Sequence, residues 1–377
     1  MNIGIVCYPT FGGSGVVATE LGKALAKKGH RVHFMAYNLP FRLNPFSENL
    51  FYHEVSVNDY PLFEYQPYES ALASKIVDVA MYERLDVLHV HYAIPHASVA
   101  YLAQQILKSK KIFLPYITTL HGTDITLVGR DPSFEPVIRF SLNNSNAITS
   151  VSESLKKDTL STFKIDNKID VIPNFINLED YTKKDNSCER KHYAPNGEKI
   201  MVHVSNFRKV KRVEDVLKVF DKVRKAVPTK LILVGDGPER PAIEKLCREL
   251  DTCKDIISLG RINNPTEVLS MADLFILPSE TESFGLAALE AMAMQIPVIS
   301  TNTGGLPEVN INEVTGYLSD VGDVDDMTNN SIKLLSDEKL LAKFKSNAFE
   351  QAKKFDINNV LPLYEKLYQK VISKELV

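Results

Sequence analysis

The sequence predicts an α/β protein made of two doubly wound parallel-sheet domains, and three observations favour this fold class. In the first half, short apolar runs alternate with amphipathic helical stretches, which is typical of parallel strands joined by crossover helices. A polar stretch from Thr182 to Lys199 then interrupts the pattern. After it, the alternation starts again, and a chain of 377 residues is long enough for two cores.

The spacing of apolar residues predicts the elements of the first half. IGIVCY predicts a strand, and Val16 to Lys28 predicts a helix with one apolar stripe. Lys27, Lys28 and Gly29 provide the cations and the glycine that are typical of a helix C-terminus. Further strands are expected at RVHFMAY, DVLHVHY, PYITTL and NAITSVS.

The second half repeats this pattern with strands expected at IMVHVS, KLILVG, DIISLG, LFILPS and PVIST. We expect a first domain over 1–180, a linker over 181–198, a second domain over 199–355, and a C-terminal helix over 356–377 that packs back on the first domain. Ligands of such sheets bind beyond the carboxyl ends of the strands, so the two domains are expected to share a cleft.

Composition limits the classes of partner. A net charge of -3 with 24% charged residues gives no general attraction to nucleic acid or anionic lipid. The first apolar run is too short for a signal or membrane helix, so we expect a cytoplasmic protein without stable membrane association. The four cysteines show no metal or redox spacing and are expected to be reduced thiols: Cys7, Cys188, Cys247 and Cys253.

A glycine-rich loop, Gly13 to Ala18, lies between the first strand and the first helix and matches G-x-G-x-x-A. Enzymes that bind NAD usually carry an acid about 20 residues further on, at the end of the second strand. Here that strand ends in Tyr37 to Leu39, so a nicotinamide site is disfavoured. What remains is a set of backbone amides at a helix N-terminus, suited to a small anion or a diphosphate.

Two segments of the second half predict an anion site. SNFRKVKRVEDV places four cations just before a helix, where they oppose the helix dipole unless an anion lies among them: Arg208, Lys209, Lys211 and Arg212. Glu214 and Asp215 suit the first turn of that helix. The alternative is a solvated basic turn, whereas nucleic-acid binding would need a wider basic face with exposed aromatic residues.

The second segment is SETESFGLAALEAMAM. Ser283 is expected to cap a helix whose first amides belong to Phe284, Gly285 and Leu286. Glu282 precedes this helix, and Glu290 is a lone carboxylate among apolar residues, which is costly unless it is paired. Amides that bind a diphosphate and carboxylates that accept from sugar hydroxyls suit a sugar nucleotide. A structural Glu290 paired with backbone is the alternative.

Four histidines of the first half, His89, His91, His96 and His121, are not expected to bind a metal, because no carboxylate or thiol completes a ligand set with recognisable spacing. The D-x-D sequence Asp323 to Asp325 is expected to cap a helix rather than to bind magnesium. We therefore expect no cofactor and no metal.

ESFGLAALE resembles the E-x7-E signature of the retaining glycosyltransferases of family 4, which implies the GT-B fold of two Rossmann-like domains facing across a cleft. The resemblance covers nearly the whole chain and is strongest to the members that act first in bacillithiol synthesis. It implies that domain 1–180 binds the acceptor, that domain 199–355 binds the donor, and that the enzyme transfers N-acetylglucosamine from UDP-GlcNAc to L-malate. The motifs that carry it are GGSGVVATELGKALAKKGH, PFRLN, HVHYAIPHA, TTLHGTD, IRFSLNNSNAITSVSE, SNFRKVKR and TNTGGLPEV.

The resemblance also implies roles for individual residues. Catalytic roles are expected for His121, Lys211, Arg208 and Glu282. Donor contacts are expected from Gly13, Asn206, Arg208, Lys211, Arg261, Glu282, Ser283, Phe284, Gly285, Leu286 and Glu290. Acceptor contacts are expected from Gly13, Ser14, Tyr92, Thr123 and Arg139.

Some of these roles have alternatives in the sequence. Many members of the family carry Gly-Arg where this chain reads Ser205 and Asn206, so Arg208 is the candidate to replace the arginine of the diphosphate clamp. His121 could be a hydrogen-bonded core histidine, and Arg139 could form an ion pair along its helix. The rival functions are a glycosidase using Glu282 and Glu290, an epimerase acting on the same nucleotide, and a sugar-nucleotide sensor. The oligomeric state stays open between a monomer and a homo-oligomer.

Overall fold

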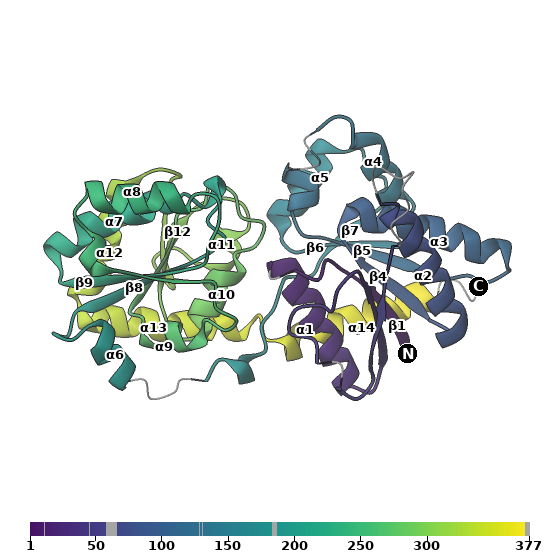
Figure 1. Ribbon diagram of the computed structural model, residues 1–377, viewed down its shortest axis with the longest axis horizontal. Helices are drawn as coiled ribbons and strands as arrows, with labels where there is room; N and C mark the ends of the chain where they lie inside the picture. The colour runs from purple at the N-terminus through teal and green to yellow at the C-terminus, as the bar shows by residue number, and fades with distance from the viewer. Residues whose placement is uncertain are drawn as a thin grey trace. The chain divides into compact units, whose positions relative to one another are not determined.

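The computed structural model describes residues 1–10, 12–44, 46–57, 66–127, 129, 131–182 and 187–373. The chain divides into two compact units, which Figure 1 shows as ribbons. Unit 1 contains Met1–Phe175 and Ile357–Val377, and unit 2 contains Ile176–Asp356. The chain therefore passes from one unit to the other twice, and both of its ends belong to unit 1. The two crossing points are neighbours, because Ile176 pairs with Asp356.

Unit 1 is built on a parallel sheet of seven strands in the order β3-β2-β1-β4-β5-β6-β7. β1 pairs with β2 on one side and β4 on the other, so the order of the strands reverses between β1 and β4. Ligands of doubly wound sheets bind beyond the carboxyl ends of the strands at such a reversal. The strands are β1 (Asn2–Val6), β2 (Arg31–Ala36), β3 (Leu50–Glu54), β4 (Val87–His91), β5 (Tyr116–Leu120), β6 (Ala147–Ser150) and β7 (Ile169–Val171).

Helices cover this sheet, with α1 packed on α14 and α2 packed on α3 (Figure 1). The C-terminal helix α14 also packs on β4, although the whole of unit 2 separates them in sequence. The helices are α1 (Gly13–Lys27), α2 (Tyr68–Glu83), α3 (Ser98–Ser109), α4 (Glu135–Asn143), α5 (Glu153–Thr162) and α14 (Ile357–Ser373), with short helical turns η1 (Ala93–Ala97) and η2 (Thr123–Leu127).

Unit 2 is built on a second parallel sheet, of six strands in the order β10-β9-β8-β11-β12-β13. Its reversal lies between β8 and β11, which are paired neighbours. The strands are β8 (Lys199–Val204), β9 (Thr229–Val234), β10 (Ile256–Gly260), β11 (Leu274–Leu277), β12 (Val298–Thr301) and β13 (Gly316–Ser319).

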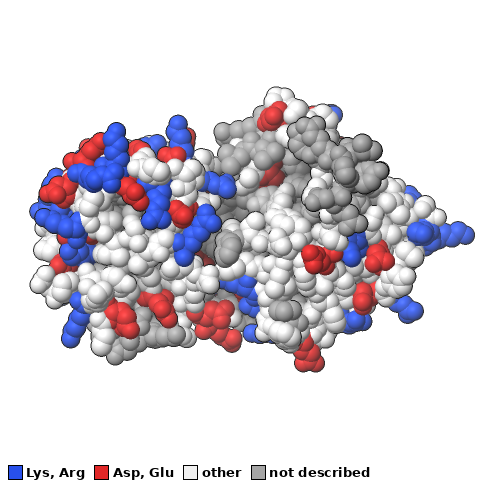
Figure 2. Space-filling model, viewed as in Figure 1, with Lys and Arg blue, Asp and Glu red and all other residues white. Residues whose placement is uncertain are grey.

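Helices lie on both faces of this sheet, with α7, α8 and α12 on one face and α9, α10 and α13 on the other (Figure 1). Figure 2 shows that basic and acidic side chains intermingle over the face with α7, α8 and α12 and form no face of a single charge. The helices are α6 (Ser187–Tyr193), α7 (Val213–Ala226), α8 (Arg240–Glu249), α9 (Thr266–Met271), α10 (Leu286–Ala293), α11 (Leu306–Val309), α12 (Val324–Ser336) and α13 (Glu338–Lys353), with turns η4 (Leu178–Asp180), η5 (Lys209–Lys211) and η6 (Cys253–Asp255).

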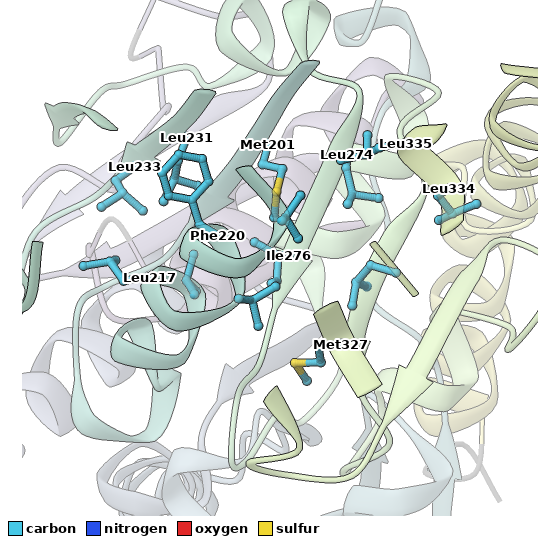
Figure 3. Close-up of a cluster of buried hydrophobic side chains, with 14 of the residues drawn as sticks. Met201, Leu217, Phe220, Leu231, Leu233, Leu274, Ile276, Met327, Leu334 and Leu335 are labelled. Atoms are coloured by element: carbon cyan, nitrogen blue, oxygen red, sulfur yellow. The ribbon is translucent and has the colours of Figure 1, made fainter. Parts of the chain in front are cut away.

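The core of unit 2 joins β8, β9 and β11 to α7 and α12, as Figure 3 shows. Each fully buried apolar side chain in such a cluster stabilises the fold by about 1.5–3 kcal/mol. The cluster fixes both ends of the loop between β8 and α7. Its labelled members are Met201, Leu217, Phe220, Leu231, Leu233, Leu274, Ile276, Met327, Leu334 and Leu335.

The predicted fold class is confirmed, and each expected strand is present. Three strands were not expected: β3, β7 and β13. The polar segment 181–198 contains α6 and groups with unit 2. Within it, Arg190 donates to the buried Asp273 carboxylate over 2.7 Å, so this segment is attached to unit 2 by a charged hydrogen bond.

The expectation of reduced thiols is wrong for one pair, because Cys247 and Cys253 form a disulfide. The end of α8 and the turn η6 bring their Cα atoms to 5.2 Å, a separation that suits such a bond. Cys7 and Cys188 are free. No helix in the described part of the chain combines the length and apolar character needed to cross a membrane.

Candidate functional site

In unit 2, the loops that follow β8 and β11 meet at the strand-order reversal. The β8 loop carries Ser205 to Arg212, and the β11 loop carries Glu282. The backbone joins the two loops, since the amide of Glu280 donates to the carbonyl of Val210 over 2.8 Å. The topology therefore brings the basic segment and the acidic segment of the sequence together.

Lys211 and Glu282 form an ion pair at this position. The Nζ of Lys211 donates to Oε1 of Glu282 over 2.5 Å, and about one-sixth of each side chain is exposed. A charge-assisted bond that is mostly shielded from water is stronger than an ordinary surface ion pair. Two of the residues expected to be catalytic thus contact each other directly, although 71 positions separate them in sequence.

The other cations of the basic segment take different positions. Arg212 has a left-handed backbone with φ of 48°, and its guanidinium donates to Asp215 over 2.6 Å. Asp215 in the first turn of α7 therefore pairs with Arg212 directly. Asn206 and Arg208 are exposed in the β8 loop, and Arg261 is exposed just after β10.

Helix α10 begins later than the sequence predicts. It starts at Leu286 with Gly285 as its N-cap, so the expectation that Ser283 caps this helix is wrong. Gly285 has φ of +100°, a conformation that side chains disfavour, and a Cβ there would lie 2.6 Å from Leu306. The left-handed turn at Gly285 redirects the chain, which separates Ser283 from the first turn of the helix. Phe284 is buried, and its ring packs edge-on against Phe355.

A pair of glycines in the loop after β12 supports the backbone of Glu282. A Cβ on Gly304, which has φ of +57°, would lie 1.8 Å from the carbonyl oxygen of Glu282. A Cβ on Gly305 would lie 2.4 Å from the carbonyl oxygen of Ser283. The amide of Gly305 donates to that Glu282 carbonyl over 2.9 Å. Glycine is therefore required in TNTGGLPEV because two backbones touch there.

Glu290 is buried in α10 and accepts a hydrogen bond from the hydroxyl of Tyr181 over 2.8 Å. This side-chain donor offsets the expected cost of a carboxylate among apolar residues. Tyr181 belongs to the segment expected as a linker. No signal in the sequence identifies it as the partner of Glu290.

His203 is a further residue at this strand-order reversal, beside the β8 loop. It is buried in β8, next to Ser205, and burial lowers its pKa to about 4. Its Nδ1 lies 2.8 Å from the carbonyl oxygen of Ile276, so Nδ1 carries the proton and donates. Its Nε2 then accepts from the Ser205 hydroxyl over 2.7 Å. A histidine inside the apolar run IMVHVS is the signal that could have identified it.

In unit 1, three expected residues gather at the reversal between β1 and β4. Ser14, in the first turn of α1, shares a hydrogen bond of 2.7 Å with the hydroxyl of Tyr92, which follows β4. The ring of Tyr92 lies 5.4 Å from that of His121, which follows β5. The N-cap of α1 is Gly12, which makes no side-chain capping bond. Gly13 is exposed next to it.

The four histidines of the segments HVHYAIPHA and TTLHGTD are all buried, and the rings of His89, His91 and His121 stack in a row. His91 and His121 share a ring hydrogen bond of 2.8 Å, and His89 bonds to the hydroxyls of Thr119 and Tyr368. Burial lowers the pKa of His89 and His121 to about 3 and that of His96 to about 4. Nowhere in the described ranges do three or more His, Cys, Asp or Glu side chains gather so as to hold a metal ion.

Three further expectations concern Thr123, Arg139 and Asp323. Thr123 is exposed at the start of η2. Arg139 is half exposed on α4 and pairs with Glu135 one turn earlier over 3.4 Å, which is the alternative that the sequence leaves open. Asp323 caps α12 by accepting from the amide of Asp326, as expected.

The chain matches two family models that together span most of its length. Residues 11–180 match the model "Glycosyltransferase Family 4", and residues 185–351 match "Glycosyl transferases group 1". It is 47% identical to the N-acetyl-alpha-D-glucosaminyl L-malate synthase of Bacillus anthracis over 377 residues, which are 100% of this chain and 98% of that protein. The chain belongs to the family 4 glycosyltransferases.

Solved structures agree with the fold of this glycosyltransferase. The sucrose-phosphate synthase of Thermosynechococcus elongatus superposes with a TM-score of 0.82 at 20% identity, covering 99% of this chain and 100% of that one. Anabaena HepE in complex with UDP-glucose superposes with a TM-score of 0.82 at 18% identity, covering 98% and 100%. The glycosyltransferase thus has the GT-B fold, with its family signature from Glu282 to Glu290 beside Lys211.

Proposed function

We propose that this glycosyltransferase moves N-acetylglucosamine from UDP-GlcNAc to the hydroxyl of L-malate, releasing UDP and retaining the anomeric configuration. The observation that carries the proposal is the 47% identity over the full length to a relative whose name states this product. Residues that select the acceptor lie in a different unit from those that bind the donor, so similarity through both units supports both substrates. We propose the cytoplasm as the place of the reaction.

The donor half of the proposal assigns the diphosphate to unit 2. Lys211 and Arg208 would neutralise the diphosphate together with the first amides of α10 at Leu286. The Lys211–Glu282 contact supports this role, because a diphosphate brings two charges that compete with one carboxylate for the ammonium group. Asn206, Arg261, Phe284, Gly285 and Glu290 complete the proposed donor contacts, with Ser283 in the loop before them.

The acceptor half assigns malate to unit 1. Malate carries two carboxylates, so it requires donors and cations. The amides of Gly13 and Ser14 at the N-terminus of α1, the hydroxyls of Tyr92 and Thr123, and the guanidinium of Arg139 are the proposed donors. Arg139 would exchange Glu135 for a malate carboxylate, at the small cost of a half-exposed ion pair.

The proposed chemical step breaks the bond between the anomeric carbon and the β-phosphate oxygen. A bond from the malate hydroxyl oxygen to the same face of that carbon replaces it, and the hydroxyl proton passes to the leaving phosphate oxygen. The enzyme contributes positioning and the positive charge of its clamp, which hold the reactants and stabilise the departing UDP. The backbone carbonyl of His121 is proposed to face the positive charge that develops at the anomeric carbon. With that clamp in place, no metal or other cofactor is proposed.

The test is UDP release from UDP-GlcNAc with and without L-malate, in the presence of a chelator. Release that depends on malate and persists with chelator supports both the acceptor and the metal-free clamp. Release only with a different hydroxyl acceptor would reject malate, and conversion of UDP-GlcNAc without any acceptor would favour an epimerase. Tight UDP binding without turnover would favour a sensor, and hydrolysis of a simple glycoside would favour a glycosidase.

A further inference from the structure

Asp124, in the turn η2 three residues after His121, is a buried carboxylate that no role described so far uses. Only 2% of the residue is exposed. One oxygen accepts from the amide of Ala93 over 2.8 Å, and the other accepts from the amide of Gly122 over 3.0 Å. The two amides belong to the loops that follow β4 and β5. A single carboxylate therefore joins the two loops that carry Tyr92 and His121.

The bond to Gly122 fixes the direction of the carbonyl group of His121. Both groups belong to the same planar trans peptide, in which N–H and C=O point in opposite directions. Since the N–H of Gly122 points at Asp124, the C=O of His121 points away from Asp124. A donor bonded to a carboxylate also polarises its peptide, which makes the carbonyl oxygen at the other end more negative.

The bond to Ala93 holds a strained backbone. Tyr92 has φ of 87°, a conformation that a bulky side chain disfavours and that costs about 1–3 kcal/mol. Such strain persists only where the surroundings fix it. Tyr92 is held by its own amide, which donates to the carbonyl of Thr119 over 2.9 Å, and by the amide that follows it, which donates to Asp124.

We propose that Asp124 is a positioning residue, which orients and polarises the His121–Gly122 peptide toward the reacting sugar and holds Tyr92 in place for the acceptor. The inference deepens the proposed function and rests on it for the roles of His121 and Tyr92. Asp124 itself does not touch either substrate. The amides of Ala93 and Gly122 each need an acceptor oxygen, and the ionised carboxylate provides both. The ionised form of Asp124 is therefore the one that positions the two loops.

The charge of Asp124 changes in an accessible range of pH. Burial raises the pKa of the Asp124 carboxyl to about 6, and the hydrogen bonds from Ala93 and Gly122 oppose that rise. Burial lowers the pKa of the neighbouring histidines and raises that of Tyr8, so these groups are neutral near pH 6. The titratable and charged groups on the adjoining elements are Tyr8, His91, Tyr92, His96, His121 and, on α5, Glu153, Lys156, Lys157 and Asp158.

The first experiment compares Asp124→Asn with the wild-type enzyme. The amide keeps one acceptor oxygen and loses the charge, so kcat is expected to fall by about 10- to 100-fold, while KM for UDP-GlcNAc and the Kd of UDP change less than about threefold. Asp337→Asn is the matched control, because Asp337 also accepts from two amides, those of Lys339 and Leu340, at a helix N-cap in unit 2. We expect Asp337→Asn to leave kcat unchanged.

The pH profile separates positioning from a merely structural role. Wild-type kcat should fall about tenfold for each pH unit below about 6, and Asp124→Asn should lack this acid limb. A variant with wild-type kcat, or one that is slow but keeps the acid limb, would overturn the proposal. If Asp124→Asn fails to bind UDP because it has not folded, the pH profile of the wild-type enzyme tests the proposal alone. A wild-type kcat that is flat from pH 5 to pH 8 would then reject the proposal.

A readout without turnover keeps this inference separate from the proposed function. The amide resonances of Ala93 and Gly122 in the wild-type enzyme should titrate together with a midpoint near pH 6. If they do and malate supports no UDP release, the acceptor assignment fails and the role of Asp124 stands. If neither resonance moves between pH 5 and pH 8, the role of Asp124 fails whatever the acceptor is.

Discussion

Lys211 and Glu282 form an ion pair at the site where we propose that the diphosphate binds. In this structure the ammonium group is held by a carboxylate at 2.5 Å, in a setting that is mostly shielded from water. Removing one member of such a pair leaves the other charge without compensation, which is costly in a shielded site. A ligand that carries its own negative charge avoids this cost by taking the place of Glu282.

The first prediction concerns Lys211→Ala. Its kcat is expected to fall by about 10²- to 10³-fold if, as we propose, the ammonium stabilises the charge that grows on the departing phosphate. The Kd of UDP is expected to rise only about fivefold, since the amides and Arg208 remain. Single-turnover kinetics and calorimetry with UDP measure the two quantities.

Lys222→Ala is the control for this substitution. Lys222 is half exposed on α7 and pairs with the exposed Asp325, so its removal should change kcat less than twofold. Equal losses in kcat and in UDP affinity for Lys211→Ala would instead mean that Lys211 binds the ground state and the transition state alike.

At the residue scale, the sequence predicts a contact correctly where the order of the strands in the sheet determines it. Lys211 and Glu282 follow neighbouring strands of one sheet, so a correct assignment of the strands brings them together. Asp124, His203 and Tyr181 were missed for a different reason. Each acts through a buried hydrogen bond to a group far away in sequence, such as Glu290 for Tyr181, and no local pattern encodes such a partner.

At the scale of elements, the loop between β12 and α11 acts as a support for Glu282. Gly304 and Gly305 allow its backbone to touch the backbone of Glu282 and Ser283, where any Cβ would collide. The position of the acidic loop is therefore determined by residues that carry no side chain. A substitution there should move the carboxylate without touching it.

The second prediction concerns Gly304→Ala. The added methyl group would lie 1.8 Å from the carbonyl oxygen of Glu282, so the loop must shift, and a displacement of about 1 Å can reduce turnover by about 10²-fold. Steady-state assays give kcat, and thermal unfolding reports the strain. Unchanged kcat would mean that the Glu282 loop tolerates displacement.

Gly197→Ala is the control at this scale. Gly197 has φ of +80°, and no atom lies within 4 Å of the place that an added methyl group would take, so alanine there adds only the left-handed strain of about 1 kcal/mol. A loss of stability with unchanged kcat is expected. Comparing the two variants separates collision from strain.

Element boundaries and some strands could not be read from the sequence. β3, in LFYHE, mixes polar with apolar residues because it lies at the edge of its sheet, and β7 has only three residues. β13 begins at Gly316, where a Cβ would collide with the backbone of Val298. Glycine is therefore needed at this position for the close backbone contact, although it has a low strand propensity. The start of α10 was misplaced because Gly285, not Ser283, makes the turn.

At the scale of the molecule, the buried histidines make unit 1 the acid-sensitive half. Burial holds the pKa of His89, His96 and His121 well below 6.5, so the unfolded chain binds protons that the folded chain does not. Stability is therefore lost as pH falls from about 6.5 toward 3, by about 2 kcal/mol for each such histidine at pH 5. Asp124 acts in the opposite direction, since its raised pKa favours the folded state as pH falls through 6.

The third prediction follows for the whole chain. Between pH 7 and pH 5, amides of β4 and β5 should lose protection from hydrogen exchange, after correction for the intrinsic rate, before those of β8 and β11. Unit 2 has one strongly shifted buried histidine, His203, among its described residues. Loss of protection in unit 2 first would contradict the assignment of acid sensitivity to the histidine row. His192→Gln is the control, because His192 is exposed and its removal should leave the transition in place.

The fourth prediction tests how α14 is attached to unit 1. Tyr368→Phe removes the hydroxyl that bonds Nδ1 of the buried His89 over 2.8 Å, and leaving that nitrogen unpaired should cost about 1–3 kcal/mol of unfolding free energy. Urea denaturation measures the cost. In Tyr68→Phe the lost hydroxyl is also buried, and it has no hydrogen-bond partner among the described residues, so little or no loss is expected. Equal effects of the two substitutions would mean that the hydrogen bond to His89 contributes nothing to the free energy of unfolding.

The division of unit 1 between the two ends of the chain sets an order of events during protein synthesis. Residues 1–175 leave the ribosome first, yet β4 lacks the helix that covers it until Ile357–Ser373 have emerged. Unit 2 is continuous, so all of its residues are synthesised before the helix that completes unit 1. Until α14 packs on β4, His89 and its neighbours are uncovered on one side. A pause in translation before α14 would prolong the period in which that surface can aggregate.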